Sequence, residues 1–445
     1  MLERLFHLRE RGTTPRTELV AGVTTFLTMA YIIAVNPLIL AGTPERPGPL
    51  GPDLFPAVVT ATCLGAALPT LLMGLWANYP LALASGMGLN AALAAAVSVE
   101  RGITWQAMMG VIFVEGAIIT VLVLTRVREQ VMHAIPLDLK RAIGGGIGLL
   151  IALLGLHHAH WLSSTGPGGS AVVQPPIGSF HRADALVATL GIAATAWLVA
   201  RRTRGALLLG IAITTVAAIV AGLARPPAGL AAAPDLRTFG ALDIAGALQP
   251  ILVATVFAFL ITDFFDTMGT VIAVGEQGGF LDSGGRLPRL NRVLLVDSLA
   301  AVWGGLCGAS SVTSYVESAS GVGEGGRTGL TSVVVAVLFL MALFFAPLVQ
   351  TVPAEATAAA LVVVGFLMMT VVREIDFRDY GTAIPAFLTL LVIPLTLSIS
   401  RGIGIGFISY ALLKLLSGRG REVSPVLWVL AALFALSFWL EPASS

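Results

Sequence analysis

Charge is scarce in this 445-residue sequence, in which Asp, Glu, Lys and Arg together make up only 11% of the residues. Soluble globular proteins carry about 25% charged residues, so an ordinary soluble domain is excluded. The two cysteines, Cys63 and Cys307, both lie in apolar segments, which excludes a disulfide framework or a cysteine zinc site. The formal net charge is +1 and no long basic run is present, so we expect no nucleic-acid partner.

Phosphate-binding and metal-binding motifs are also missing. The Gly-rich stretch 321–329 lacks the lysine spacing of a P-loop, so we expect no nucleotide cofactor. His157, His158 and His160 open a loop on the outer side, and no further ligand is apparent nearby. We therefore predict a solvated loop there, no metal site and no cofactor.

Long apolar runs, in contrast, are abundant, and hydrophobic residues make up 56% of the chain. About 20 apolar residues cross the roughly 30 Å hydrocarbon core of a bilayer, and a spanning chain must satisfy its own backbone as helices. We predict an all-α polytopic membrane protein with 14 segments. The segments are 18–41, 55–76, 79–97, 105–126, 140–156, 183–200, 206–224, 247–274, 293–308, 310–323, 329–350, 356–371, 383–399 and 403–416.

Basic residues set the predicted orientation. Arg4, Arg9, Arg11 and Arg16 precede the first span, which predicts a cytoplasmic N-terminus. The other basic clusters fall in alternate loops, as fourteen crossings require. The apolar run 425–441 either crosses once more or lies on the cytoplasmic surface. Short loops and the lack of a transit peptide favour a bacterial cytoplasmic membrane.

Two segments, 79–97 and 310–323, are short, rich in small residues and interrupted by glycine. Each is third in a set of seven, counted from residues 18 and 247. Interrupted segments at corresponding positions of two halves indicate an inverted-repeat transporter whose binding site lies where they meet. Alternatively, Gly and Ser could simply permit close helix packing. That alternative does not explain the polar residues at both interruptions.

Five carboxyl groups lie inside apolar segments: Glu115, Asp263, Asp266, Asp297 and Glu317. A carboxylate near the bilayer centre costs at least about 2.5–3.5 kcal/mol and usually faces a cavity, a partner or a proton pathway. No Lys or Arg lies inside the membrane in these segments to act as a counter-ion. Each group must therefore be protonated, hydrated or hydrogen-bonded. For Glu115 and Asp297 we expect a role in bridging helices.

The remaining acidic residues outline a candidate site. Asp263, Asp266 and Thr270 form one polar stripe, because residues three and four positions apart are neighbours on a helix. Glu317 lies in the second interrupted segment and Asn90 in the first. An amide offers both donors and an acceptor, which suits the edge of a heterocycle. Two alternatives stay open: Asn90 as a helix cap, and Asp263 bonded to a neighbouring helix.

Several of these stretches together resemble one family. They are 22–37, 85–91, 265–270, 315–321 and 325–331. They are similar to the AzgA-type purine permeases, the adenine/guanine/hypoxanthine branch of the nucleobase–cation symporters. The resemblance runs from about residue 4 to about residue 420. Ser85 departs from the family pattern, which has proline at this position.

The resemblance implies the seven-plus-seven inverted repeat of the uracil and xanthine permeases, with a core domain that moves against a gate domain, often in a homodimer. The third and tenth segments would be the broken ones. The implied parts are 1–139 (first half of the core), 140–246 (first half of the gate), 247–355 (second half of the core) and 356–445 (second half of the gate, including the C-terminal apolar segment).

The resemblance also implies the substrate-binding residues. The acidic residues that bind substrate in the family would be Asp266 and Glu317, and the polar asparagine would be Asn90. With Thr270 and Phe265 these residues would hold a neutral purine base, and Phe264 or Tyr315 could also stack on it. We predict uptake of adenine, guanine or hypoxanthine by secondary active transport. The coupling cation would be a proton, carried by Glu317, Asp266 or Asp263, or alternatively Na⁺.

Three other functions remain as alternatives. An anion transporter of similar fold, carrying sulfate or bicarbonate, would need positive charge or bare dipoles at the site. Two carboxylates argue against it. A membrane-embedded enzyme would need a nucleophile–base pair or a metal cluster, and no histidine lies within the predicted spans. A channel would not accumulate its solute against a gradient.

Overall fold

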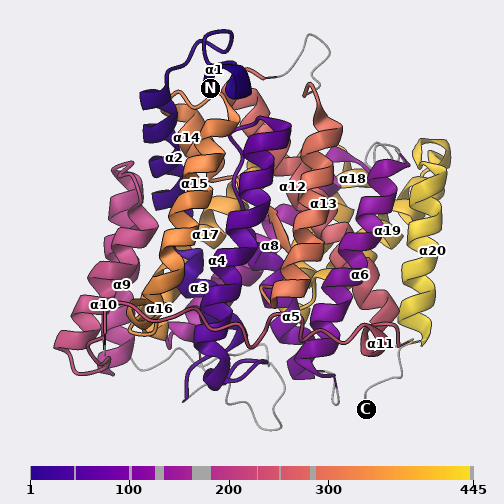
Figure 1. Cartoon of the computed structure of the whole chain (residues 1–445). Coiled ribbons are helices and arrows are strands. Elements are labelled where there is room, and N and C mark those ends of the chain that lie inside the picture. The colour runs from indigo at the N-terminus through magenta and orange to yellow at the C-terminus, as the bar shows by residue number, and fades with distance from the viewer. Residues whose placement is uncertain are drawn as a thin grey trace.

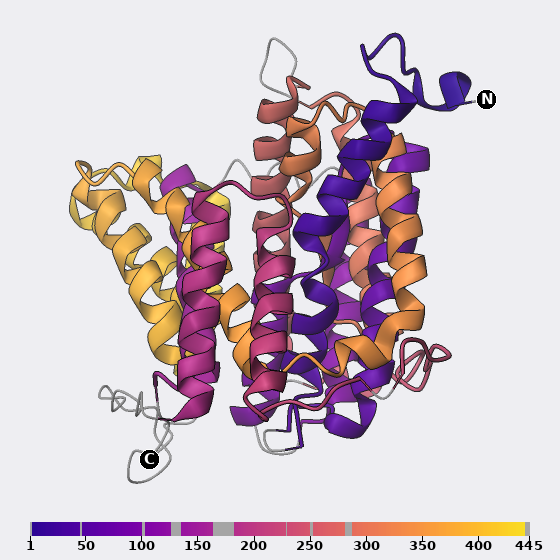
Figure 2. The ribbon, with the colours of Figure 1, turned by 90° about the vertical axis from the view of Figure 1, so that its left-hand side faces the viewer.

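The long helices of the computed structural model run side by side, with the N-terminal α1 at one end of the molecule (Figures 1 and 2). The structure describes residues 2–44, 47–99, 103–125, 135–162, 182–227, 229–249, 252–280 and 287–440. The helices named below are α2 (Pro15–Met29), α3 (Ile32–Leu40), α4 (Phe55–Leu72), α5 (Met87–Val99), α6 (Trp105–Leu124), α8 (Leu137–His158), α9 (Ala183–Ala200), α10 (Ala206–Val220), α11 (Ile244–Ala247), α12 (Val253–Gly278), α13 (Leu290–Cys307), α14 (Ser318–Gly323), α15 (Gly329–Ala342), α17 (Ala354–Met369), α18 (Tyr380–Thr396), α19 (Ile399–Leu416) and α20 (Pro425–Leu440). Two further short helices are α1 (Leu2–Phe6) and α16 (Ala346–Val349).

Eight helical stretches among the described residues are long and apolar enough to cross a membrane. Large apolar side chains also lie on the outside of these helices. Examples are Leu124, Leu190, Val216 and Phe366, each more than half exposed. An outward apolar surface on long helices is what lipid requires. The prediction of a polytopic membrane protein is therefore confirmed, while the count of fourteen segments stays a prediction.

The two interrupted segments contain strands, so the prediction of an entirely helical chain was wrong in this detail. Strand β1 (Leu83–Ser85) pairs antiparallel with β2 (Val312–Ser314), and Ala84 lies opposite Thr313. Each strand leads toward a helix, β1 into α5 and β2 into α14. Backbone groups at membrane depth need partners within the protein, and pairing the two segments provides them. The interrupted segments therefore meet, as their positions in the sequence predicted.

Side chains complete the hydrogen bonding of this small sheet. The Thr70 hydroxyl lies 2.9 Å from the backbone nitrogen of Leu83, from which it accepts, and 3.1 Å from the Leu83 carbonyl, to which it donates. Asn36 donates to Thr62 Oγ1 at 2.8 Å and to the Ala309 carbonyl at 3.1 Å. The Ser85 hydroxyl donates to the same carbonyl at 2.7 Å. The sheet is thus fixed to both α3 and α4.

The first span is interrupted between α2 and α3, at Ala30 and Tyr31. Pro37 lies inside α3. One turn before the interruption, the Thr28 hydroxyl donates to the carbonyls of Thr24 and Thr25 at 3.1 and 2.8 Å. Hydroxyl bonds of this kind bend helices, which gives a physical reason for the position of the break.

A buried carboxylate joins the beginning of α2 to the beginning of α15. Glu18 is fully buried and accepts from the backbone nitrogen atoms of Arg327, Thr328 and Thr331 at 2.8, 3.3 and 3.2 Å. The Thr331 hydroxyl donates to it at 2.6 Å. The first N–H groups of a helix have no partner within the helix, and a negative charge there is favoured by the helix dipole. The acid therefore caps a helix from the opposite half of the chain.

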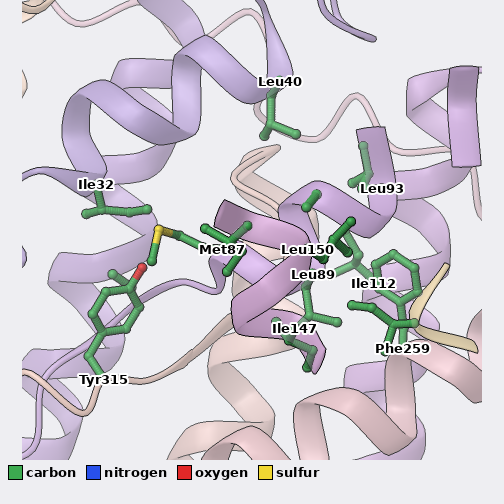
Figure 3. Packing of buried hydrophobic residues seen from close by; sticks show 14 of the residues in the cluster. Ile32, Leu40, Met87, Leu89, Leu93, Ile112, Ile147, Leu150, Phe259 and Tyr315 are labelled. Atoms are coloured by element: carbon green, nitrogen blue, oxygen red, sulfur yellow. The ribbon is translucent and has the colours of Figure 1, made fainter. Parts of the chain in front are cut away.

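Helix α5 passes through the centre of the apolar core (Figure 3). Leu89 and Leu93 of α5 lie near Ile147 and Leu150 of α8 and near Phe259 of α12. A Cβ atom at Gly88 would come within 2.6 Å of Ile147 Cγ2, so this position requires glycine for the close approach of the two helices. The broken segment is therefore held from several sides.

We expect Glu18→Ala to lower the free energy of unfolding by about 1.5–3 kcal/mol, because buried N–H groups of α15 lose a charged acceptor. The measurement is thermal unfolding of the purified protein in detergent. Glu10→Ala serves as the control, since the Glu10 side chain is 78% exposed. Equal melting temperatures for the two variants would contradict this account of the α2–α15 contact.

Candidate functional site

Helices α2, α12 and α14 come together where the broken segments meet. The loop after β2 carries Tyr315 and Glu317 into α14, and α12 carries Asp266 near the middle of its length. Helix α12 contacts both β2 and α14, and α14 also contacts α2. Residues from distant parts of the sequence are thereby brought to one place.

Glu317 is half-buried immediately before α14, and its carboxylate is held by a tyrosine from the first span. The Tyr31 hydroxyl donates to Glu317 Oε1 at 2.7 Å, and Tyr31 is itself fully buried. Ser320 donates to the Glu317 carbonyl at 2.6 Å and pairs with the Thr28 hydroxyl at 2.8 Å. Sequence reasoning missed Tyr31, although it lies within a stretch that carries the family resemblance.

Asp266 is half-buried and makes no hydrogen bond to the residues that the structure describes. The charges that act on it come from Asp297 and Glu317. It also interacts electrostatically with Tyr31. The structure therefore brings the two predicted substrate acids together, and in this part of the chain no cation balances them. A ligand with N–H donors could satisfy both groups.

Asn90 is fully buried, and neither its amide nitrogen nor its amide oxygen has a hydrogen-bond partner among the described residues. It lies inside α5, which begins at Met87, so the alternative of a helix cap is wrong. Buried polar groups in proteins are nearly always hydrogen-bonded, so an unpaired amide calls for a partner such as a ligand. Among the described residues, Asn90 makes no hydrogen bond to Asp266 or Glu317.

The remaining predicted residues differ in position. Thr270 is buried one turn beyond Asp266 on α12. Phe265 is also in α12, but its side chain lies outside the described part of the structure. Phe264 lines an apolar cavity with Val114 of α6 and Leu430 of α20. Phe264 thus contributes to a different surface of α12 from the one that carries Asp266.

Tyr315 lies close to the beginning of α5. Its ring lies near Met87 and Ile32 (Figure 3), and its hydroxyl donates to the Ser85 carbonyl. The ring therefore covers the junction between β1 and α5, next to Glu317 in sequence.

Asp263, three residues before Asp266, has different neighbours. It lies 3.4 Å from the Ser311 hydroxyl, which also donates to Glu115 at 2.9 Å. The alternative in which Asp263 bonds to a neighbouring segment is therefore the one that the geometry supports. Glu115 reaches from α6 to the residue before β2, which confirms its expected role as a bridge between segments.

Asp297 of α13 bridges in a similar way, as expected. Its Oδ1 accepts from the Ser314 backbone nitrogen at 3.0 Å and from the Ser314 hydroxyl at 2.9 Å. Its Oδ2 accepts from Thr267 of α12 at 2.6 Å. Thr267 in turn pairs with the Thr313 hydroxyl at 2.8 Å. The carboxylate thus fixes β2 between α12 and α13.

His157 and His158 end α8, and His160, two residues beyond it, has carboxylate neighbours that the sequence did not reveal. His160 Nε2 lies 3.5 Å from Asp184 and 3.6 Å from Glu355. The expectation that no further ligand lies near these histidines was therefore wrong. Arg182 also donates hydrogen bonds to Asp184, so a basic side chain of the protein already pairs with one of the two carboxylates.

Comparisons with known proteins show the family of this chain. A model described as the Permease family matches residues 16–405. The chain belongs to this family. It is therefore a membrane transporter and not an enzyme. Adenine permease AdeP of Escherichia coli is 42% identical over 98% of this chain and 95% of its own length. Guanine/hypoxanthine permease PbuG of Bacillus subtilis is 40% identical over 98% of this chain and 99% of its own length.

Among solved structures, the permease is similar to the transmembrane domain of the cyanobacterial bicarbonate transporter BicA. The TM-score is 0.60 at 18% identity, over 88% of this chain and 96% of the other. At that level of identity the likeness shows the fold alone. The permease thus shares its fold with an anion transporter, while its sequence relatives are named as nucleobase permeases.

For the bridge at Asp297, we expect Asp297→Ala to destabilise the protein by about 1–3 kcal/mol, since the buried Ser314 N–H group loses its acceptor. Asp297→Asn keeps an amide oxygen for that N–H group and can donate to Thr267, so its loss is smaller. Thermal unfolding in detergent measures both. A larger loss for asparagine than for alanine would contradict the bridging geometry.

Proposed function

We propose that this permease is a secondary active transporter that imports purine nucleobases, namely adenine, guanine or hypoxanthine, across the cell membrane. The observation that carries the proposal is the pair of acids Asp266 and Glu317, which act on each other with no balancing cation among the described residues. Such a pair suits a neutral ligand that donates hydrogen bonds and repels an anion. The relatives named as adenine and guanine/hypoxanthine permeases support the same class of substrate.

In the proposed binding mode, Glu317 and Asp266 accept hydrogen bonds from ring N–H groups or an exocyclic amine. The unpaired amide of Asn90 binds another edge of the heterocycle through its donor and acceptor. Thr270, buried one turn beyond Asp266, adds a hydroxyl. Tyr31 orients the Glu317 carboxylate through its hydrogen bond. A base lacking one donor leaves a buried acceptor unpaired and is rejected.

The proposed architecture is the seven-plus-seven inverted repeat with broken third and tenth segments. Residues 1–139 and 247–355 form the core, and 140–246 and 356–445 form the gate. The N-terminus is cytoplasmic, and two copies form a homodimer. An ion pair between Arg204, in the turn before α10, and Glu324, at the end of α14, joins the proposed gate to the proposed core at 2.6 Å. Alternating access would require this contact to break and re-form.

A cation gradient supplies the energy in this proposal. The cation is a proton, and the carboxyl groups available to carry it are Glu317, Asp266 and Asp263. Sodium is the alternative, because carboxylates and hydroxyls also bind Na⁺. The two are distinguished by imposing a pH gradient without sodium and a sodium gradient without a pH difference.

We expect proteoliposomes containing the permease to accumulate labelled adenine, guanine or hypoxanthine when the interior is made alkaline, and Glu317→Gln to abolish this uptake. The change removes one acidic acceptor of the base and leaves the side-chain shape nearly the same. Glu10→Gln is the matched control at an exposed site. If the folded wild-type protein takes up none of the three bases under a pH gradient or a sodium gradient, the proposal of purine transport is wrong.

We expect Tyr31→Phe to weaken purine binding about tenfold, equivalent to about 1.4 kcal/mol, because the Glu317 carboxylate loses its orienting donor. Equilibrium binding of the labelled base to purified protein measures the change. Tyr380→Phe is the control, since Tyr380 is 73% exposed. Unchanged affinity in Tyr31→Phe would remove Tyr31 from the binding site.

A further inference from the structure

Glu115 is a fully buried acid whose second oxygen has no partner. It lies in the middle of α6, and its Oε1 accepts from the Ser311 hydroxyl at 2.9 Å. Its Oε2 is buried without a hydrogen-bond partner among the residues that the structure describes. An ionised carboxylate is very unfavourable in such a position unless its charge is compensated. The unpaired oxygen therefore indicates that Glu115 holds a proton or another small cation.

A second acid, Asp263, contacts the same Ser311 hydroxyl. Ser311 Oγ is 3.4 Å from Asp263 Oδ1 and has a single hydrogen, which is directed to Glu115 or to Asp263 but not to both. When two carboxyl groups share a site without a cation, they do not both ionise. One proton divided between Glu115 and Asp263 resolves the conflict.

The surroundings offer no other compensation in the described part of the chain. The elements packed against α6 are α5, α11, α12 and α13. Near Glu115 these supply Asp263 from α12, which shares the Ser311 hydroxyl, and Asp297 from α13, which acts directly on Glu115. The basic residue of α13, Arg292, is bonded to the Trp76 carbonyl near the beginning of that helix. The charged groups placed near Glu115 by the described residues, Asp263 and Asp297, are therefore both acidic.

The pair is joined to the broken segments through Ser311. The Ser311 carbonyl accepts from the Gly86 backbone nitrogen at 2.9 Å, immediately before α5, which carries Asn90. On its other side Ser311 leads into β2 and on to Glu317. A proton gained or lost between Glu115 and Asp263 thus changes the buried charge next to the link that positions both halves of the proposed site.

We infer that Glu115, Ser311 and Asp263 form a second ion site, in which Glu115 and Asp263 share the one proton that is coupled to purine uptake. The pair takes up the proton while the transporter faces outward and releases it to the cytoplasm. Glu317 and Asp266 are then left to bind the base. The inference rests on the proposed purine transport and assigns its proton to a site apart from the base.

The test compares binding with accumulation in Glu115→Gln, which removes the titratable group but keeps its shape and an acceptor for Ser311. We expect purine binding and purine counterflow to stay within about twofold of wild type. Accumulation driven by an inside-alkaline gradient should fall to the level reached without a gradient, and purine-induced proton entry, followed with a trapped pH dye, should disappear. Glu115→Asp, which restores a titratable group, should recover both.

Asp263→Asn provides a second variant should Glu115→Gln fail to fold, and the same loss of coupling with retained binding is expected. Gradient-driven accumulation in Glu115→Gln equal to wild type would overturn the inference, as would loss of purine binding in the folded variant. Failure of the proposed function gives a different result, namely no purine binding or uptake by the wild-type protein itself.

Discussion

The antiparallel pairing of β1 with β2 is the interaction on which the rest of this transporter depends. Both strands lie in segments that stop being helical inside the protein, where their backbone groups need partners. Each strand provides partners for the other, and Thr70, Asn36 and Ser85 supply further hydrogen bonds around the pair. The directions of α5 and α14 follow from this sheet, and with them the positions of Asn90 and Glu317.

Helix α12 serves two groups of partners. Asp266 interacts with Glu317, whereas Asp263, three residues earlier, lies against Ser311 near Glu115. The two aspartates of α12 therefore have different neighbours, and Asp297 of α13 acts on both Asp266 and Glu115. Both aspartates lie on the same helix, so any displacement of α12 would move the two together.

Much of this could be predicted from sequence because burying charge in an apolar segment is costly. That cost singled out Glu115, Asp297 and Glu317 without any knowledge of the fold. Glycine and serine in two short segments likewise indicated where the helices break. The resemblance to purine permeases then assigned roles to particular acids and to Asn90.

Features that depend on distant partners could not be predicted. The strands exist only because residues more than 200 positions apart are paired, and nothing in either segment alone distinguishes a strand from a distorted helix. Nothing in the first span marks Tyr31 as a site residue, because Glu317, which accepts its hydrogen bond, lies 286 residues away in the sequence. The carboxylates near His160 were hidden for the same reason.

The shared sheet also has a consequence for how the protein is made. The Ser85 hydroxyl donates to the carbonyl of Ala309, which is synthesised 224 residues later, so this hydrogen bond cannot form until then. Throughout that interval β1 has an unpaired edge, and Asn36 lacks one of its acceptors. The first half of the chain therefore leaves the ribosome as an incomplete structure that must be sheltered by the insertion machinery. A chain released early would keep exposed polar groups in the membrane, where quality-control proteases could recognise it.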